Sequence, residues 1–245
     1  MTSPDPAWHW SGERPTGSVL VVPNALAAAY VPQMVCDLLI ENLALPHLGS
    51  VQVPQVLPFA GRGRYSHTDF HFLSPVDMYA CQDLAVVQHR SPIARGRSRE
   101  HAFLLWNTFG RYSRLVLVLN SISAVARESD RALSAPLGSV WYLANAPGRA
   151  WVEAHAPEWI ALNETDVLPA YWPLARARGW IAALFEAAAA TVPLVVPHVF
   201  VHAGDNRHVA ARLVESLARS MSWSLEECKE PPSWAIGFDA NGNGT

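Results

Sequence analysis

Polar residues follow two apolar runs, residues 115–119 and 194–201, at the points where parallel strands would end. Because ligands of open α/β sheets bind beyond the carboxyl ends of the strands, these side chains could line a pocket for a nucleoside or a phosphate compound. The competing interpretation is that they form turns and that Asp205 or Asn206 caps the next helix. We favour capping, because it needs one residue whereas a catalytic pocket needs several in alignment. The candidate pocket residues are Asn120, Ser121, Ser123 and Asp205.

Three histidines, His198, His202 and His208, surround Asp205 in the sequence and could ligate a metal ion. On an extended strand His198 and His202 would face the same side of the sheet. Their backbones would then lie roughly 13 Å apart, which is too far for both rings to hold one ion. We therefore expect neither a metal site nor a cofactor.

No residue stands in a motif that would activate a nucleophile. No serine lies in a G-x-S-x-G turn, and the cysteines show neither metal-ligand nor disulfide spacing. An odd number of distant cysteines indicates reduced thiols, as in the cytoplasm or the nucleus. We therefore expect no catalytic residue. The cysteines are Cys36, Cys81 and Cys228.

Four arginines lie within residues 90–99, where they could bind phosphate or an acidic protein surface. The formal net charge of −3 gives the chain no general attraction to nucleic acid, so an acidic protein partner is the favoured ligand. The competing interpretation is a solvated loop. The ten tryptophans add side chains that, like arginine, are enriched in protein interfaces. The arginines predicted to bind a partner are Arg90, Arg95 and Arg97.

A strand and a helix near the N-terminus position another strand end. Residues 18–22 form a short, mainly apolar run, as in a parallel strand covered on both faces. In the helix that follows, Gln33, Asp37 and Glu41 form one narrow polar stripe, so its other sides are packed. The turn between them, residues 25–32, has no glycine to let a phosphate approach the backbone. This unit predicts a scaffold for binding rather than a nucleotide site.

The remaining apolar segments alternate between strands and helices. We predict an α/β fold with three α/β/α layers, a mainly parallel central sheet and antiparallel edge strands. Residues 72–79 and 84–89 predict an antiparallel hairpin, and residues 145–173 a loop-rich segment. The other predicted strands are residues 49–53, 55–59, 115–119, 141–143 and 194–201. The predicted helices are residues 33–45 and 99–109, one opened by Pro173 and one started by residues 204–206.

The composition fits one large domain. Of 245 residues, 50% are hydrophobic and 16% are charged, which supplies ample material for a core. We predict a single domain at residues 18–239, between a lead-in at residues 1–17 and a tail at residues 240–245. No apolar stretch reaches the roughly 18–20 residues that span a bilayer, and the N-terminus lacks the apolar core of a signal peptide. We therefore expect an intracellular protein without a membrane partner.

Short segments spread over nearly the whole chain support a family assignment through their order and spacing. The first are Val22-Pro23, residues 36–40, Leu48-Gly49, residues 56–58 and Tyr65. The next are Met78-Tyr79, residues 84–91 and the run 115–119 with Ser121. The last are Gly204-Asp205-Asn206, Pro232-Ser233-Trp234 and Phe238. Together they resemble the proteasome assembly chaperone 2 family.

The resemblance implies an α/β/α domain without a catalytic residue or a metal. It implies pairing with a related subunit, proteasome assembly chaperone 1, and a heterodimer that sits on the outer face of the α-subunit ring of the 20S proteasome. The heterodimer would promote assembly of that ring and block off-pathway dimerisation of rings. Within this resemblance, Trp234 and Phe238 join the arginines as predicted partner-binding residues.

Two features depart from the family. The family usually carries glycines in the turn after the first strand, whereas this chain has Ala27, Ala28, Ala29 and Pro32, so the turn must be shaped differently. Family chaperones can also dock a C-terminal hydrophobic–tyrosine–any-residue tail between α subunits. The C-terminal residues 241–245 carry no such anchor, so we expect the partner to supply it.

The sequence therefore supports two functions of different classes. The first is a non-enzymatic assembly chaperone that acts through its surface. The alternative is a nucleoside- or phosphate-handling enzyme that uses the crevice at the strand ends. Stabilisation by nucleosides, nucleotides or phosphate would distinguish them, because a ligand that binds only the folded state raises the melting temperature.

Overall fold

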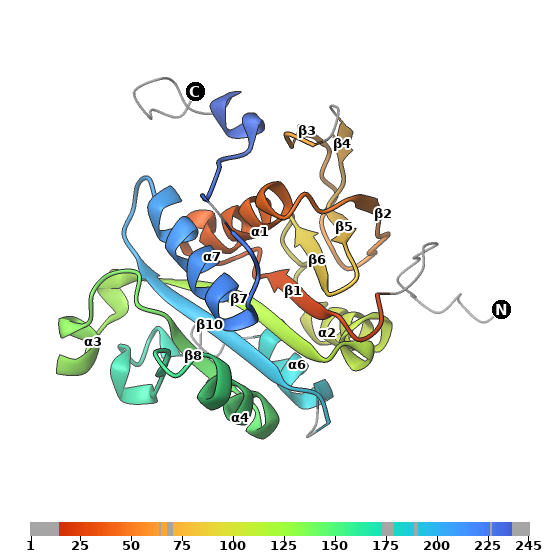
Figure 1. Cartoon of the computed structure of the whole chain (residues 1–245). Helices are drawn as coiled ribbons and strands as arrows, with labels where there is room; N and C mark the ends of the chain where they lie inside the picture. Colours follow the sequence, from red (N-terminus) through yellow and green to blue (C-terminus); the bar gives the residue numbers. More distant parts are fainter. Residues whose placement is uncertain are drawn as a thin grey trace.

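A computed structural model describes residues 15–63, 65–67, 71–172, 179–188, 191–225 and 227–236. One eight-stranded sheet lies between two layers of helices, which confirms the predicted three-layer α/β/α fold (Figure 1). A separate ribbon pairs β3 (Gly61–Gly63) with β4 (His71–Leu73). In spatial order the sheet contains β2 (His47–Ser50), β5 (Val76–Ala80), β6 (Leu84–His89), β1 (Val19–Pro23), β7 (Leu115–Ser123), β10 (Leu194–Val201), β8 (Trp141–Ala144) and β9 (Ile160–Ala161).

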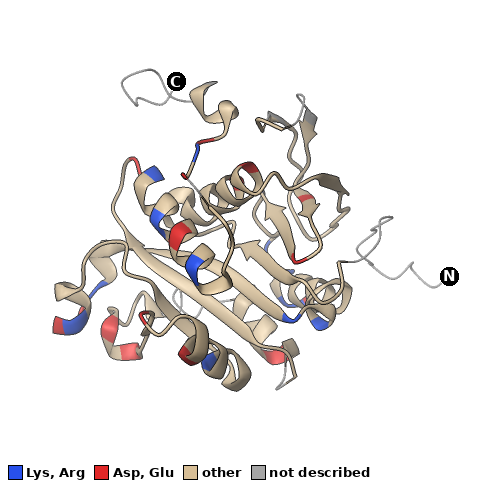
Figure 2. Ribbon diagram, in the orientation of Figure 1, with Lys and Arg blue, Asp and Glu red and all other residues tan. Residues whose placement is uncertain are grey.

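The centre of the sheet is parallel and its flanks are mixed. Strands β6, β1, β7 and β10 pair in parallel, whereas β5 is antiparallel to β6 and β8 is antiparallel to β10. The predicted hairpin is therefore confirmed by the β5–β6 pair. Figure 2 shows most charged residues on helices and loops, and β1, β7 and β10 contain no Lys, Arg, Asp or Glu. Such strands lack charged side chains because helices cover both faces of the sheet.

Side chains alternate between the two faces of the sheet. On β1, Val19 and Val21 enter the core beneath one helical layer, and Leu20 and Val22 enter the core beneath the other. The first layer contains α1 (Val31–Asn42), α4 (Ala146–His155) and α7 (Arg207–Met221). The second contains α2 (Ser98–Thr108) and α6 (Trp180–Ala188). None of the described helices is long and apolar enough to cross a membrane.

Shorter helical segments connect these elements. The short α-helix α3 (Asp130–Ser134) follows the end of β7. The 3₁₀ turns are η1 (Ala28–Tyr30), η2 (Gly110–Tyr112), η3 (Ala124–Ala126), η4 (Glu164–Asp166) and η5 (Pro232–Ile236). The turn η1 follows β1 and η3 follows β7, so both lie at the carboxyl ends of the central parallel strands.

Several predicted segments were wrong. The loop-rich prediction for residues 145–173 missed the helix α4, which occupies about a third of them. Asn145 caps this helix by accepting a hydrogen bond from the N–H of Gly148 at 2.9 Å. Residues 55–59 form no strand, only a bridge from Val56 to Ile93. The edge strand predicted at residues 49–53 is instead β2, four residues that begin at His47.

Other predictions fall outside the description. The helix opened by Pro173 is confirmed in its second part as α6, whereas residues 173–178 at its start lie outside the described residues. The tail at residues 240–245 and the lead-in up to residue 14 also lie outside them. The helix predicted at residues 99–109 is confirmed as α2, and the last predicted helix is confirmed as α7.

Candidate functional site

A groove of about 740 Å³ opens beyond the carboxyl ends of β7 and β10. Ser123 and Val201 stand at these strand ends, and the turn η1 forms a second wall. Trp234, in the C-terminal turn η5, lines another side of the groove. The groove therefore lies where open α/β sheets bind ligands. Of the four predicted pocket residues, Ser123 and Asp205 line it.

Asp205 serves the start of α7. Its Oδ1 accepts a hydrogen bond from the backbone N–H of Arg207 at 3.0 Å, and its Oδ2 lies 2.6 Å from Nη2 of the same arginine. These bonds from Arg207 lower the pKa of the Asp205 carboxyl. Asn206 instead donates its side-chain amide to the carbonyl of His202. Asn206 occupies the N-cap position of α7 but its side chain makes no capping bond, and Asp205, one position earlier, instead accepts from the first N–H of the helix. The geometry therefore supports a turn-forming role for Asp205.

Asn120 and Ser121 hold the turn that follows β1. The Ser121 hydroxyl donates to the carbonyl of Ala28 at 2.5 Å, and Oδ1 of Asn120 accepts from Nδ2 of Asn24 at 2.9 Å. Both residues line a smaller hollow beside the groove rather than the groove itself. The structure thus divides the predicted pocket residues between two neighbouring sites.

The three histidines do not converge. His198 is buried in β10 with its Nδ1 2.7 Å from the carbonyl of Val196, whereas His202 and His208 are exposed. Within the described ranges, no three His, Cys, Asp or Glu side chains are grouped so that they could hold a metal ion.

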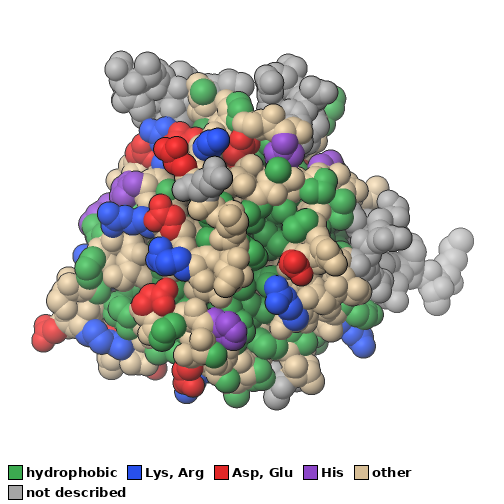
Figure 3. Space-filling model, in the orientation of Figure 1, with side chains coloured by type: hydrophobic (Ala, Val, Ile, Leu, Met, Phe, Trp, Pro, Cys, Tyr) green, Lys and Arg blue, Asp and Glu red, His purple; other side chains and the backbone are tan. Residues whose placement is uncertain are grey.

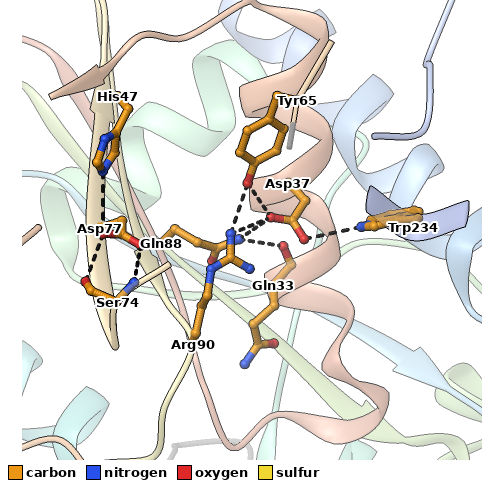
Figure 4. A network of polar contacts seen from close by, with 9 residues as sticks. All are labelled: Gln33, Asp37, His47, Tyr65, Ser74, Asp77, Gln88, Arg90 and Trp234. Atoms are coloured by element: carbon orange, nitrogen blue, oxygen red, sulfur yellow. Dashed lines mark hydrogen bonds and ion pairs between the residues drawn. The ribbon is translucent and has the colours of Figure 1, made fainter. Parts of the chain in front are cut away.

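A polar network under α1 brings together two of the predicted partner-binding residues. Oδ1 of Asp37 accepts hydrogen bonds from the Tyr65 hydroxyl at 2.7 Å, from Nε2 of Gln88 at 2.8 Å and from Nη2 of Arg90 at 3.1 Å (Figure 4). Oδ2 of Asp37 lies 3.3 Å from the indole nitrogen of Trp234, which donates to it. One carboxylate therefore joins helix α1, strand β6 and the C-terminal segment.

This network turns Arg90 inward. Only 14% of its side chain is exposed, and it forms an ion pair with Asp37. Burial alone would lower the pKa of Arg90, but the charge of Asp37 raises it above its ordinary value, with smaller contributions from Tyr65 and Tyr79. The guanidinium thus remains charged while contributing little to the surface.

The exposed part of the arginine segment lies beyond Arg90. Arg95 is exposed, and Arg97 is exposed but paired with Glu100, with 2.5 Å between Nε and Oε2. Phe238 lies outside the described residues. Partner binding by these residues stays a prediction.

A second carboxylate, that of Asp77, stabilises the edge of the sheet through hydrogen bonds. Asp77 on β5 accepts hydrogen bonds from the Ser50 hydroxyl at 2.8 Å and from the backbone N–H of Ser74 at 2.9 Å, and it lies 3.5 Å from Nε2 of His47. Burial alone would raise the pKa of Asp77, but the bonds from these three residues lower it below its ordinary value. Asp77 is therefore a buried anion with a structural role.

Sequence reasoning identified the polar stripe of α1 but missed what it binds. The side chains of Asp37 and Glu41 have partners, since Oε2 of Glu41 accepts from the N–H of Ser66 at 2.8 Å. Gln33 contributes its backbone carbonyl, which accepts from Gln88 at 3.1 Å, and its buried side-chain amide has no hydrogen-bond partner among the described residues. A narrow polar stripe on a helix packed on its other sides was the available signal, because buried polar groups require partners.

Sequence reasoning also missed an apolar surface at the carboxyl end of the sheet. Leu26 is 70% exposed, Tyr30 69% and Val125 64%, and these three residues, which we name the edge patch, flank the ends of β1 and β7. Tyr30 and its neighbour Ala29 adopt left-handed backbone, with φ of 53° and 54°. Such strain in non-glycine residues is concentrated at functional sites, because the surrounding structure must hold it in place. The glycine-free turn is therefore shaped as a strained, outward-facing ridge.

Charge does not dominate the surface. On the face shown in Figure 3, acidic and basic side chains are interspersed, with hydrophobic side chains exposed between them. This face thus offers no field of one sign to attract nucleic acid or anionic lipid.

The fold is that of a known structural class. The crystal structure of PbaA from Pyrococcus furiosus, an archaeal homolog of proteasome-assembly chaperone, is similar with a TM-score of 0.63 and 14% identity, over 86% of this chain and 84% of that one. A proteasome-assembly chaperone homologue from Mycobacterium tuberculosis is similar with a TM-score of 0.54 and 10% identity, over 85% and 87% of the two chains. At such identities the likeness shows a shared fold.

The family follows from the sequence. The model of the PAC2 family matches residues 26–226, and the chain therefore belongs to the PAC2 family. A relative from Danio rerio, Proteasome assembly chaperone 2, is 27% identical over 252 residues, which cover 91% of this chain and 92% of the relative. The family resemblance found in the sequence is confirmed.

Proposed function

We propose that this protein is a non-enzymatic assembly chaperone of the 20S proteasome. It pairs with a related subunit, proteasome assembly chaperone 1, and promotes assembly of the α-subunit ring in the cytoplasm and nucleus. The observation that carries the proposal is the PAC2 family match over residues 26–226, together with a relative named Proteasome assembly chaperone 2 that is matched over 92% of its length.

The edge patch fits this function. An assembly chaperone acts by shape and by a few strongly buried contacts, for which exposed aromatic and apolar side chains are suited. Leu26 and Tyr30 provide such side chains on a turn whose backbone is fixed by bonds to β7. We assign the contact with the related subunit to this surface.

Co-expression tests the proposal. The chain is produced alone and with proteasome assembly chaperone 1, and soluble yield and complex formation are measured by size-exclusion chromatography. We expect a higher soluble yield and a stable heterodimer, which Leu26→Asp abolishes. Leu57→Asp is the matched control, since Leu57 is also exposed, at 47%, but lies outside the edge patch. A lone chain that is equally soluble and forms no heterodimer would contradict the proposal.

A second candidate function rests on the volume of the groove. At about 740 Å³ it falls within the roughly 300–1,000 Å³ typical of small-molecule sites, so an enzyme that handles nucleosides or phosphate compounds could use it. Thermal melting with nucleosides, nucleotides and inorganic phosphate distinguishes the two functions. Stabilisation that Ser123→Leu removes would favour the enzyme, and unchanged melting favours the chaperone.

A further inference from the structure

A smaller hollow of about 230 Å³ adjoins the groove, between the ends of β1 and β7. Ala28 and Ser123 line both spaces and separate them. Leu26 of the edge patch lies at the hollow, and Asn120 and Trp180 form part of its wall. The chemistry of this wall specifies what the hollow can bind.

The hydrogen bonds around Asn24 fix the orientation of two amides. The backbone N–H of Leu26 donates to Oδ1 of Asn24 at 3.1 Å, and the indole N–H of Trp180 approaches the same oxygen at 3.4 Å. Both of these groups are donors only, so the oxygen of Asn24 must face them and its Nδ2 must face Asn120. The atom of Asn120 that meets this Nδ2 at 2.9 Å is therefore its oxygen.

The other end of the Asn120 amide is consequently a donor, and it is unused. Asn120 is only 1% exposed, and its Nδ2 has no hydrogen-bond partner among the described residues. A buried donor without an acceptor is destabilising, and native proteins seldom retain one without a reason. Asn120 lines the hollow, so an acceptor atom held there would complete its hydrogen bonds.

The ligand must bring an uncharged acceptor and a small apolar group. None of the described residues that line the hollow is Asp, Glu, Lys, Arg or His, so nothing there would neutralise a phosphate or a carboxylate. A carbonyl oxygen matches the amide donor without this cost. The volume lies below the roughly 300 Å³ at which small-molecule sites begin, which leaves room for about one side chain and its adjoining backbone.

We propose that this hollow binds an extended segment of a partner protein, taking up one apolar side chain while a backbone carbonyl of that segment accepts a hydrogen bond from Nδ2 of Asn120. The exposed Leu26 then packs against the segment. The chemistry of the hollow does not depend on the proposed chaperone function. Only the identification of the partner as an assembly partner rests on that function. It names the anchor for the contact assigned above to the edge patch.

A direct test uses a minimal probe of this chemistry, N-acetyl-L-leucinamide, which combines one apolar side chain with amide carbonyls. The probe is titrated into ¹⁵N-labelled full-length protein, and the side-chain amide signal of Asn120 is followed by NMR. The signal is assigned by its loss in Asn120→Asp, which keeps the acceptor for Asn24 and removes the free donor. We expect a saturable shift with a dissociation constant on the order of 1 mM, the affinity of a ligand of about twelve non-hydrogen atoms.

A filled hollow provides the control. Ser98 begins α2, lines the hollow and is partly exposed, so Ser98→Leu fills the space and leaves the hydrogen bond between Asn24 and Asn120 in place. Ser139→Leu is the matched variant, since Ser139 is a partly exposed serine that lines a different depression. We expect a loss of at least tenfold in affinity for Ser98→Leu and no change for Ser139→Leu. No shift in the wild type, or an equal shift in Ser98→Leu, would overturn the inference, as would a stronger response to adenosine or inorganic phosphate.

Failure of the inference and failure of the proposed function give different results. The same variants are co-expressed with proteasome assembly chaperone 1. If the heterodimer forms equally with the wild type and Ser98→Leu, the function stands and the hollow is not its anchor. If the probe shifts the Asn120 signal but no heterodimer forms, the hollow binds peptide and the proposed partner is wrong.

Discussion

Replacing Asp37 by alanine should lower the free energy of unfolding by about 3 kcal/mol. The change leaves the guanidinium of Arg90, 14% exposed, without its counter-charge, and removal of one partner from a buried ion pair costs roughly 3–5 kcal/mol. We place the effect at the lower end because both side chains keep some contact with water. Tyr65, Gln88 and Trp234 lose an acceptor at the same time, which adds to the cost.

A comparison of two ion pairs separates burial from distance. The exposed pair of Arg97 with Glu100 has the shorter contact, 2.5 Å against 3.1 Å for Arg90 with Asp37. If distance decided the energy, Arg97→Met would be the more damaging change. Because exposed pairs contribute little to stability, we expect Arg97→Met to leave the free energy of unfolding nearly unchanged and Arg90→Met to lower it by more than about 1 kcal/mol.

Urea unfolding followed by far-ultraviolet circular dichroism measures these differences. This signal avoids the fluorescence of Trp234, which is itself bonded to Asp37. A double-mutant cycle with Asp37→Ala and Arg90→Met should give a combined loss smaller than the sum of the single losses, since the double variant leaves no unpaired charge. A cost below about 1 kcal/mol for Asp37→Ala, or equal costs for Arg90→Met and Arg97→Met, would refute this reasoning.

Three other predictions concern the remainder of the fold. Burial lowers the pKa of His89 to about 4, and burial, with repulsion from His89, lowers the pKa of His101, so the unfolded chain takes up protons first as the pH falls. Urea unfolding should show stability intact above about pH 6.5 and a loss of up to about 3 kcal/mol from His89 between pH 6.5 and 4. Gly148→Ala should destabilise by about 2–3 kcal/mol in thermal melting, because its Cβ would collide with the carbonyl oxygen of Leu194; an unchanged melting temperature would contradict the packing of α4 on β10. Ala29→Gly should stabilise by about 0.5–1 kcal/mol, since glycine relieves the left-handed strain at the expense of chain entropy, and a loss of stability would refute the assigned backbone.

The layers of this fold were predictable because hydrophobic pattern alone specifies them. The apolar run at residues 115–119 of β7 requires cover on both faces of the sheet, and the narrow polar stripe of α1 leaves the other sides of this helix to pack against its neighbours. Helix α4 was missed because its sequence has no sustained apolar period: Pro147 and Gly148 lie in its first turn, and the cap at Asn145 and packing on β10 stabilise it. Local propensity is a weak guide where contacts distant in sequence decide the structure.

The site was less predictable, for a reason visible in its bonds. Asp37 bonds to Trp234, 197 positions away, and Asn24 bonds to Asn120, 96 positions away. Residue types and spacing identify a polar side chain that needs a partner, but they do not identify which distant side chain will supply it. For the same reason the sequence grouped Arg90 with Arg95 and Arg97 as surface arginines. Arg95 and Arg97 are exposed, but Arg90 is mostly buried against Asp37.

The glycine-free turn after β1 links these observations. A flexible turn would lose conformational entropy on binding a partner, whereas a turn already fixed in its bound shape avoids that cost. Here Ala29 and Tyr30 are held in left-handed backbone, and the bond from Ser121 to the carbonyl of Ala28 fastens the turn to β7. The turn presents Leu26 and Tyr30 outward and forms the wall between the groove and the hollow. The strain is thus consistent with a contact surface organised before its partner arrives.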